Sequence, residues 1–404
     1  MRILAIETSC DDTGIAILDV HPVKSAKGGV LPKAKQFDRV NRSKFNVLSN
    51  IVSSQIKIHK KYGGVFPMMA KREHQKNLTP VLKETLRKAK LLKKNQKSNM
   101  KSKKYISKIR NIENVLKKEE NLLYQLEKFL QDYEKPSVDL IAVTNGPGLE
   151  PCLWVGVNFA KVLSYFWNIS VVPVNHIESH ILVNFLDNQK IEFPAISLIV
   201  SGGHTQLILV KGIGKYKIIG ETRDDAAGEC FDKCAKILGL EYPGGPIISK
   251  LAAKTDRRRA SIKLPRPMIN TKDYDFSFSG LKTAVLYKVR DQGLRIKDKG
   301  FIQQMCFEIQ QAIVDVLIKK TINAAKNYKV KTIILGGGVS ANKELREQLK
   351  EKIEKDIPDT KCLIPDYALS TDNALMIAIT GYFNKSKKTT WEDIEANANL
   401  RIGK

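Results

Sequence analysis

The sequence has few cysteines and no long hydrophobic run. Its 404 residues include six cysteines, which are scattered along the chain and form no CxxC pair. This usage is typical of a reducing compartment rather than of a secreted disulfide framework. No apolar run approaches the length of a membrane span, and the N-terminus reads as a strand and turn rather than a signal peptide. We therefore expect a soluble, cytoplasmic protein with no membrane partner.

Acidic residues are also scarce relative to basic ones. There are 68 Lys and Arg against 42 Asp and Glu, a formal net charge of +26. Such an excess favours a polyanionic partner, with nucleic acid the first candidate. The alternative is lysine placed at every tolerant surface position, without a partner. The length exceeds one ordinary core, and 43% apolar residues are enough for two lobes.

Strands and helices alternate along most of the chain. Residues 2–20 form two apolar runs around a polar turn, which predicts a hairpin. Residues 44–62 read as a helix, and from Val138 onward strands are followed by Gly-rich turns and helices. The pattern predicts two α/β lobes that face a cleft, although no duplication is visible in residue identities.

One basic segment interrupts this pattern. Residues 87–110 carry eleven Lys or Arg and no acid, and residues 111–134 keep apolar positions at a helical period. We interpret residues 91–135 as an inserted arm made of a basic segment and an amphipathic helix. Two alternatives stay open: a solvated, partly disordered surface insertion, or an arm that contacts RNA or a partner.

Four glycine-bearing turns indicate a nucleotide site. Glycine lets the backbone approach a ligand closely, and such a turn at a helix start points N–H groups at an anion. None of the four is a P-loop, and no GxGxxG occurs, so each turn alone is compatible with an ordinary loop. The turns are NGPGL at 145–149, SGGHT at 201–205, YPGGP at 242–246 and GGGVSAN at 336–342.

Two histidines four positions apart suggest a metal site. In VNHIESH, His176 and His180 lie on one face of a predicted helix. The segment is not HExxH, because Glu178 comes two positions after the first histidine. On a helix Glu178 points off the face shared by the histidines, so the general base of a metalloprotease is missing. Asp372, at the turn before an apolar helix, is a candidate third ligand, and its alternative role is to cap that helix.

The chain resembles the TsaD family, the bacterial and organellar tRNA N6-adenosine threonylcarbamoyltransferases. The resemblance spans nearly the whole chain apart from the arm and a looser stretch at about 21–44. Eight colinear motifs carry it: IETSCDDTGIAI, NGPGL, VNHIESH, LIVSGGHTQL, GETRDDAAGECFDKCAKILGLEYPGGP, FSFSGLKTA, GGGVSANKELR and TDNALMIA.

The resemblance implies an α/β fold of the actin/Hsp70-like ATPase (ASKHA) type, with two related lobes around a central cleft and the inserted helical basic arm. It implies an N-terminal lobe over residues 1–182 with the insertion at about 91–135, and a C-terminal lobe over 183–375. Residues 376–404 would form a C-terminal helix and tail that return to the N-terminal lobe.

The resemblance also implies the site residues. One divalent metal, iron(II) or zinc, would be held by His176, His180 and Asp372. The donor, threonylcarbamoyl-AMP, would lie on residues that match the family's substrate positions, and an acidic turn and a Gly-rich turn would approach its phosphate. The substrate positions are Ile199, Val200, Ser201, Gly202, Gly203, Asp232, Gly245 and Asn342, and the phosphate or cleft positions are Asp11, Asp12, Gly337 and Gly338.

The implied reaction moves a threonylcarbamoyl group from that adenylate to N6 of the adenosine 3′ of the anticodon (position 37), in tRNAs that read codons beginning with A. A metal can polarise and orient the acyl group, and no covalent nucleophile is predicted. Implied partners are tRNA, TsaB-like and TsaE-like helper proteins and an upstream TsaC-like adenylate-forming enzyme. Met68 departs from the family, where an acid is usual.

Two other functions are weighed against this one. A two-lobed kinase or chaperone-like ATPase would share the cleft, but phosphoryl transfer depends on carboxylates and Mg²⁺ rather than on a His–His–Asp site. A metalloprotease is disfavoured because the sequence has no HExxH motif and no nucleophile motif.

Overall fold

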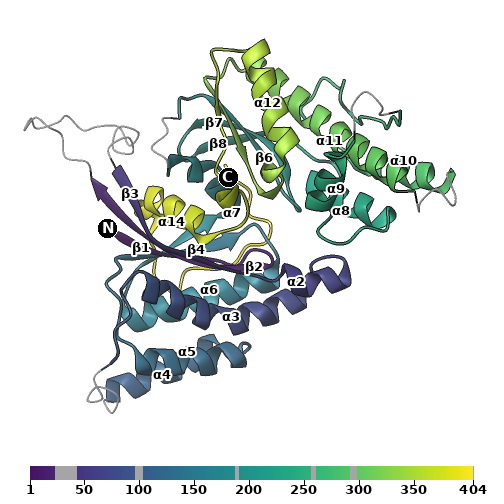
Figure 1. Ribbon diagram of the computed structural model, residues 1–404. Helices are drawn as coiled ribbons and strands as arrows, with labels where there is room; N and C mark the ends of the chain where they lie inside the picture. Colours follow the sequence, from purple (N-terminus) through teal and green to yellow (C-terminus); the bar gives the residue numbers. More distant parts are fainter. Residues whose placement is uncertain (23–42, 96–102, 187–190, 256–260, 292–297, 404) are drawn as a thin grey trace, which may run out of the picture. The chain divides into compact units, whose positions relative to one another are not determined.

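The structure is a computed structural model that describes residues 1–22, 43–95, 103–186, 191–255, 261–291 and 298–403 (Figure 1). The chain forms two compact units, which are described separately. Unit 1 consists of Met1–Gln55, Val65–Lys190 and Asp372–Arg401, and unit 2 consists of Ile56–Gly64, Ile191–Thr371 and Ile402–Lys404.

Each unit is built on one mixed sheet. The sheet of unit 1 has the order β3-β2-β1-β4-β5, and its strands are β1 (Arg2–Glu7), β2 (Asp12–Pro22), β3 (Ser43–Ser54), β4 (Leu140–Gly146) and β5 (Val171–Asn175). The sheet of unit 2 has the order β10-β9-β6-β7-β8, and its strands are β6 (Ala195–Val200), β7 (Thr205–Gly212), β8 (Lys215–Glu221), β9 (Thr332–Gly336) and β10 (Lys361–Leu363).

The two sheets share one topology. In unit 1, β1, β2 and β3 form an antiparallel meander, and β4 and β5 continue the sheet in parallel from β1. In unit 2, β6, β7 and β8 form the meander, and β9 and β10 extend it in parallel from β6. The predicted α/β class is therefore confirmed, and the repetition missing from residue identities is present in the order and direction of the strands.

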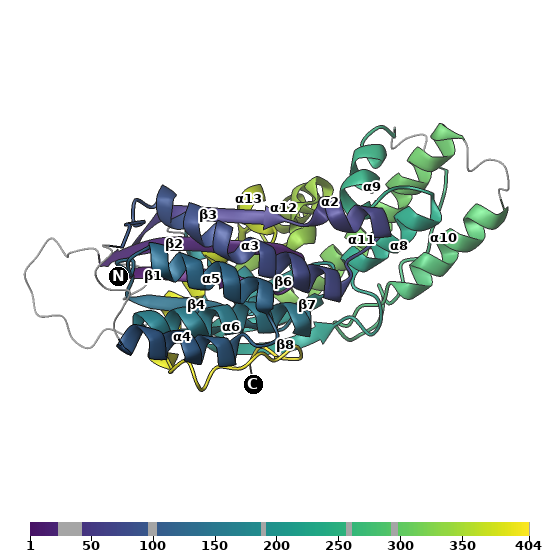
Figure 2. The same ribbon diagram turned by 90° about the horizontal axis from the view of Figure 1, so that it is seen from below.

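Helices cover both faces of the first sheet. In Figures 1 and 2, α3 and α6 lie on one face with α4 and α5 beyond them, and Figure 1 shows α14 on the opposite face. The apolar side chains of β1, β4, α3, α5 and α6 merge into one buried cluster. The helices of unit 1 are α3 (Pro67–Lys88), α4 (Lys103–Val115), α5 (Glu120–Asp132), α6 (Glu150–Trp167), α7 (His176–Leu182) and α14 (Ala374–Phe383), with 3₁₀ turns η3 (Val183–Phe185) and η7 (Lys385–Lys387).

Close packing holds α14 against the sheet. A Cβ added to Gly381 would lie 2.6 Å from Cβ of Ala142 on β4, and one added to Gly14 on β2 would lie 3.0 Å from the backbone nitrogen of Ala374. Both positions therefore exclude a side chain where helix and sheet meet. The start of α14, directly after Asp372, is thereby fixed over the same sheet that carries β5 and α7.

The second core belongs to unit 2. Apolar side chains of β6, β7 and β9 form one buried cluster with those of α8 to α12. The helices of this unit are α2 (Ile56–His59), α8 (Ala227–Ile237), α9 (Gly244–Ala252), α10 (Ser279–Asp291), α11 (Lys299–Asn327), α12 (Lys343–Asp356) and α13 (Tyr367–Ser370), with 3₁₀ turns η1 (Lys60–Tyr62) and η6 (Gly338–Ala341).

The predicted arm differs from its structure. Two helices, α4 and α5, occupy the region where one amphipathic helix is expected, and residues 96–102 of the basic segment lie outside the described residues. Ile112, Leu126 and Leu130 are fully or almost fully buried in the core of unit 1. The described helices are therefore packed structure, and the interpretation of a solvated insertion is wrong for them.

The helix predicted over residues 44–62 is also wrong. Residues 43–54 form β3, which pairs with β2 along its whole length and is the edge strand of the sheet. Only Ile56–His59 and the following 3₁₀ turn are helical. The apolar positions of this stretch fit both periods, and the pairing with β2, a tertiary contact, decides in favour of the strand.

Candidate metal centre and glycine-rich turns

The two predicted histidines lie on the first turns of α7. Asn175, the last residue of β5, caps this helix because its side-chain oxygen accepts a hydrogen bond from the backbone N–H of Glu178 at 3.1 Å. Helix α7 therefore begins at His176, and the four-residue spacing brings the rings of His176 and His180 to a centroid distance of 4.8 Å. Both imidazoles are buried.

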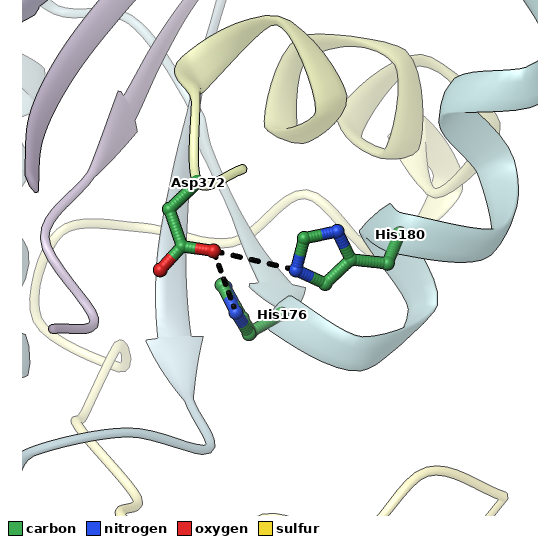
Figure 3. Close-up of side chains that lie close together, drawn as sticks. All are labelled: His176, His180 and Asp372. Carbon is green, nitrogen blue, oxygen red and sulfur yellow. Dashed lines mark ion pairs between the residues drawn. The ribbon is translucent and has the colours of Figure 1, made fainter. Parts of the chain in front are cut away.

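Asp372 faces both rings. Its Oδ1 atom lies 3.5 Å from Nε2 of His176 and 3.4 Å from Nε2 of His180 (Figure 3). The three potential ligand atoms all lie within 4.8 Å of one another. The structure thus brings together the three residues that the sequence singled out, and all three belong to unit 1.

The capping role considered for Asp372 is filled by its neighbour. The side-chain oxygen of Asn373 accepts hydrogen bonds from the backbone N–H groups of Leu375 at 3.1 Å and Met376 at 3.2 Å, and so caps α14. The cap holds the helix start, and the preceding residue directs its carboxylate toward the two imidazoles.

The other ring nitrogen of His176 faces a second carboxylate. Nδ1 lies 3.2 Å from Oε2 of Glu7 and 3.2 Å from Oγ of Ser9. Glu7 is fully buried at the end of β1, and it accepts hydrogen bonds from the backbone N–H of Ser9 at 2.6 Å and from Oγ1 of Thr144 at 2.6 Å. His176 therefore has one carboxylate at each ring nitrogen.

These charges shift the proton affinities. Burial lowers the pKa of His176, but the carboxylates of Asp372 and Glu7 outweigh it and raise that pKa to about 9. Burial lowers the pKa of His180, and the neighbouring His176 adds to this shift. Burial raises the pKa of Glu7, yet the charge and hydrogen bond of His176 lower it overall. The site therefore concentrates negative charge that a cation or a proton must balance.

The arrangement fits a divalent transition metal. Two imidazole nitrogens and one carboxylate oxygen are a donor set that zinc and iron accept. Ligand atoms around a tetrahedral zinc ion lie about 3.4 Å apart, which matches the two distances from Asp372. Nε2 of His180 is buried and makes no hydrogen bond, because its 3.4 Å approach to Asp372 lacks hydrogen-bond geometry. A metal ion would satisfy this nitrogen.

The predicted donor residues assemble separately in unit 2. Ser201, Gly202 and Gly203 follow β6, and Gly337 and Gly338 follow β9, so both turns extend from the carboxyl ends of neighbouring parallel strands. Gly337 has φ +85°, and a Cβ there would lie 2.5 Å from the carbonyl oxygen of Val200. A Cβ on Gly202 or Gly203 would meet no atom within 4 Å, so this backbone is open to a ligand.

Asp232 and Asn342 both make structural hydrogen bonds. Oδ1 of Asp232 on α8 accepts from the backbone N–H of Gly244 at 2.7 Å, at the start of α9 and next to Gly245. The side-chain oxygen of Asn342 caps α12 by accepting from Leu345 N–H at 3.0 Å, and its amide nitrogen donates to Oε1 of Gln310 at 2.9 Å. These bonds fix both side chains relative to the turns.

The acidic turn between β1 and β2 is held by a histidine that the sequence analysis did not single out. His74 on α3 is fully buried, and its ring nitrogens lie 2.7 Å from Oγ1 of Thr13 and 2.9 Å from the carbonyl oxygen of Cys10. Asp12, the first residue of β2, is half-buried, and burial together with the nearby Asp11 raises its pKa to about 7 against the hydrogen bond from Ser54.

The family assignment rests on direct comparison. The sequence profile of the TsaD family, described as tRNA N6-adenosine threonylcarbamoyltransferase, matches residues 46–97 and 117–379. This chain belongs to the TsaD family. It is therefore a transferase of that family, and the resemblance carried by the eight motifs is confirmed.

Two curated relatives show how far the likeness extends. A tRNA N6-adenosine threonylcarbamoyltransferase of Persephonella marina is 39% identical over 409 residues, which cover 100% of this chain and 96% of the relative. One of Thermosipho africanus is 40% identical over 403 residues, which cover 100% of both chains. Among solved structures, an ROK hexokinase from Thermus thermophilus is 10% identical with a TM-score of 0.44 and covers 96% of this chain and 99% of its own.

Two departures from the TsaD pattern have a place in the structure. The profile leaves out residues 98–116, which include the whole of α4 but none of α5. The part of the arm outside the family match is thus shorter than the predicted 91–135. Met68, where an acid is usual, lies at the start of α3 and is 59% exposed.

Within the described residues, no helix is both long enough and apolar enough to cross a membrane.

Proposed function

We propose that this TsaD-family protein transfers the threonylcarbamoyl group of threonylcarbamoyl-AMP to N6 of adenosine 37, 3′ of the anticodon, in tRNAs that read codons beginning with A. The observation that carries the proposal is the convergence of His176, His180 and Asp372 in a chain of this family. Relatives that align over the whole chain are tRNA N6-adenosine threonylcarbamoyltransferases, which supports it.

In this proposal His176, His180 and Asp372 hold one iron(II) or zinc ion. When bound, such an ion supplies Lewis-acid polarisation of the threonylcarbamoyl group and a fixed point for its orientation. Asp372 and the two imidazoles set the position of that point. Glu7 and Ser9 hold the far side of the His176 ring. The buried surroundings strengthen each of these electrostatic contacts.

The adenylate donor would bind on the turns of unit 2. The backbone around Ser201 to Gly203 is open, and the N–H groups of such turns can hold polar or charged groups of the adenylate. Ile199 and Val200 lead into this turn, and Gly337 and Gly338 lie beside it. Asp232, whose Oδ1 accepts from the backbone N–H of Gly244, would also contact a ribose hydroxyl of the donor. Gly245 and Asn342 complete the proposed donor site, and Asp11 and Asp12 would approach the phosphate.

The protein's role in the reaction is positioning and polarisation rather than covalent catalysis. The exocyclic amine of adenosine is a poor nucleophile because its lone pair is delocalised into the ring, so orientation of both partners lowers the barrier most. Cys152 and Cys306 are not ready nucleophiles, because burial raises the pKa of each thiol to about 12. A thiol in that range is protonated near neutral pH.

Family membership also supports proposals for the fold type, the domain boundaries and the partners of this chain. The shared topology of the two sheets supports an actin/Hsp70-like fold with two related lobes. We propose domain boundaries at 1–182, 183–375 and 376–404, the last returning to the N-terminal lobe. We also propose a cytoplasmic enzyme that works with TsaB-like and TsaE-like helpers and receives its donor from a TsaC-like enzyme. The excess of lysine would track tRNA phosphates.

A reconstituted reaction tests the function. The full-length chain is incubated with threonine, bicarbonate, ATP, an adenylate-forming enzyme, the helper proteins and a tRNA that carries adenosine at position 37. The nucleosides are then analysed by mass spectrometry. We expect modified adenosine with the native chain and none with Asp372→Ala. Unmodified tRNA in this reaction, together with ATP hydrolysis by the purified chain on its own, would favour a kinase-like ATPase instead.

A further inference from the structure

Glu7 is a buried carboxylate whose ionic partner is a histidine rather than a lysine or arginine. Its side chain is fully inaccessible at the end of β1, where an isolated charge is costly unless it is paired. Within the described residues, the ion pair recorded for Glu7 is with His176, and no Lys or Arg reaches it. The buried Glu308 of unit 2 differs, because it pairs with the permanently charged Arg266.

Two short hydrogen bonds fix the Glu7 carboxylate. The backbone N–H of Ser9 donates to Oε1 at 2.6 Å, and Oγ1 of Thr144 donates to Oε2 at 2.6 Å. These donors come from the turn after β1 and from β4, two adjacent parts of the same sheet. The carboxylate therefore has little freedom to turn away from the imidazole that it faces.

When Nε2 binds a metal ion, this fixed acceptor holds the remaining proton of His176 on Nδ1. A neutral imidazole has one N–H donor and one lone pair. Oε2 of Glu7 lies 3.2 Å from Nδ1, so the N–H is favoured there, and the lone pair of Nε2 then points toward Asp372, 3.5 Å away. Ligating histidines in metalloproteins commonly donate their other N–H to a carboxylate in this way, which orients the ring and raises its basicity as a ligand.

We propose that Glu7 is a positioning residue for the metal centre. It holds His176 in the tautomer and orientation that present Nε2 to the ion, and its buried charge is balanced by the ion acting through the imidazole. This inference rests on the proposed function, because it requires that His176, His180 and Asp372 hold a divalent metal. Thr144 and Ser9 support the same arrangement through their hydrogen bonds to the Glu7 carboxylate.

The test measures Zn²⁺ binding rather than catalysis. The dissociation constant of the full-length chain is determined by competition with a chromophoric chelator and compared with those of three variants. Glu7→Gln keeps the size of the side chain and removes its charge. Thr144→Val removes the hydroxyl that holds Oε2. Glu308→Gln is the matched control, a buried carboxylate that faces no histidine of the site.

We expect Glu7→Gln to weaken Zn²⁺ binding about 10- to 100-fold. Thr144→Val should act in the same direction by a smaller factor, and Glu308→Gln should leave the constant unchanged. The visible absorption of bound Co²⁺ should shift in Glu7→Gln, since the donor strength of His176 changes, and stay constant in Glu308→Gln. A merely structural role for Glu7 would not move this spectrum.

The outcomes separate this inference from the proposed function. Native Zn²⁺ affinity in both Glu7→Gln and Thr144→Val would overturn the role of Glu7 and leave the metal site standing. If Glu7→Gln does not fold, as judged by circular dichroism, Thr144→Val decides. A native chain that binds no Zn²⁺ or Co²⁺ would refute the metal site itself, and the role of Glu7 with it.

Discussion

Oδ1 of Asp372 lies 3.4 Å from Nε2 of His180, although the two residues are far apart in the sequence. His180 lies within α7, and Asp372 lies just before α14. The contact depends on two helix starts that are each capped by an asparagine. Asn175 caps α7, which carries both histidines, and Asn373 caps α14, directly after Asp372. The metal centre is therefore built where two capped helices begin over one sheet.

The cap of α14 provides a first prediction. Asn373→Ala removes the acceptor for two backbone N–H groups and should lower the free energy of unfolding by about 1 kcal/mol. Urea denaturation in the presence of a chelator measures this, because bound metal then makes no contribution. Asn373→Ser keeps a capping oxygen and serves as the control. Equal stability of the alanine and serine variants would contradict the capping role.

Asp12 predicts a pH-dependent stability. Its pKa in the folded protein is raised to about 7 from the ordinary value of 3.8, chiefly by burial, so the folded state favours the protonated acid. The stability from this group is present below about pH 4 and is lost as the pH rises through 7. Asp12→Asn removes the titration and should raise the free energy of unfolding at pH 8 by on the order of 2 to 4 kcal/mol.

Urea denaturation of the native chain and of Asp12→Asn at several pH values checks this sign. The two curves should nearly coincide below pH 4, separate between about pH 4 and 7, and stay a constant distance apart above that range. A stability difference that is the same at all pH values would show that Asp12 is not the titrating group.

The packing of α5 yields a third prediction. Leu126 is fully buried in the core of unit 1, so Leu126→Ala should cost about 2 to 5 kcal/mol of unfolding free energy. Tyr124, two positions earlier on the same helix, is 71% exposed, and Tyr124→Ala should change stability by less than about 0.5 kcal/mol. Urea denaturation compares them, and a small effect at both positions would return α5 to a loosely attached arm.

The helical spacing of His176 and His180 was readable from the sequence because the pattern is local. The role of Asp372 was not, since the residues alone were compatible both with a metal ligand and with a helix cap. The resemblance to TsaD favoured the metal role, and the structure shows that Asn373 takes the cap. The choice depended on a neighbouring side chain whose direction no spacing rule gives.

Contacts between distant segments determine the features that the sequence did not predict. Glu7 ends the apolar strand β1, and an acid at the end of a buried strand indicates a functional position. Its partners Thr144 and His176 could not be predicted, because strand pairing brings them to it. Asp224 accepts hydrogen bonds from the backbone and side chain of Ser279 and from Ser277, and so joins two motifs that the sequence analysis treated separately. The sequence predicts a helix where β3 lies for the same reason: the strand conformation depends on pairing with β2, which local spacing does not reveal.

The metal content of the purified chain tests the central claim most directly. Elemental analysis of the native protein should find about one iron or zinc ion per chain, and His180→Ala and Asp372→Ala should lose it while circular dichroism stays native. Full metal content in both variants, or a metal-free native chain that still modifies tRNA, would contradict the account.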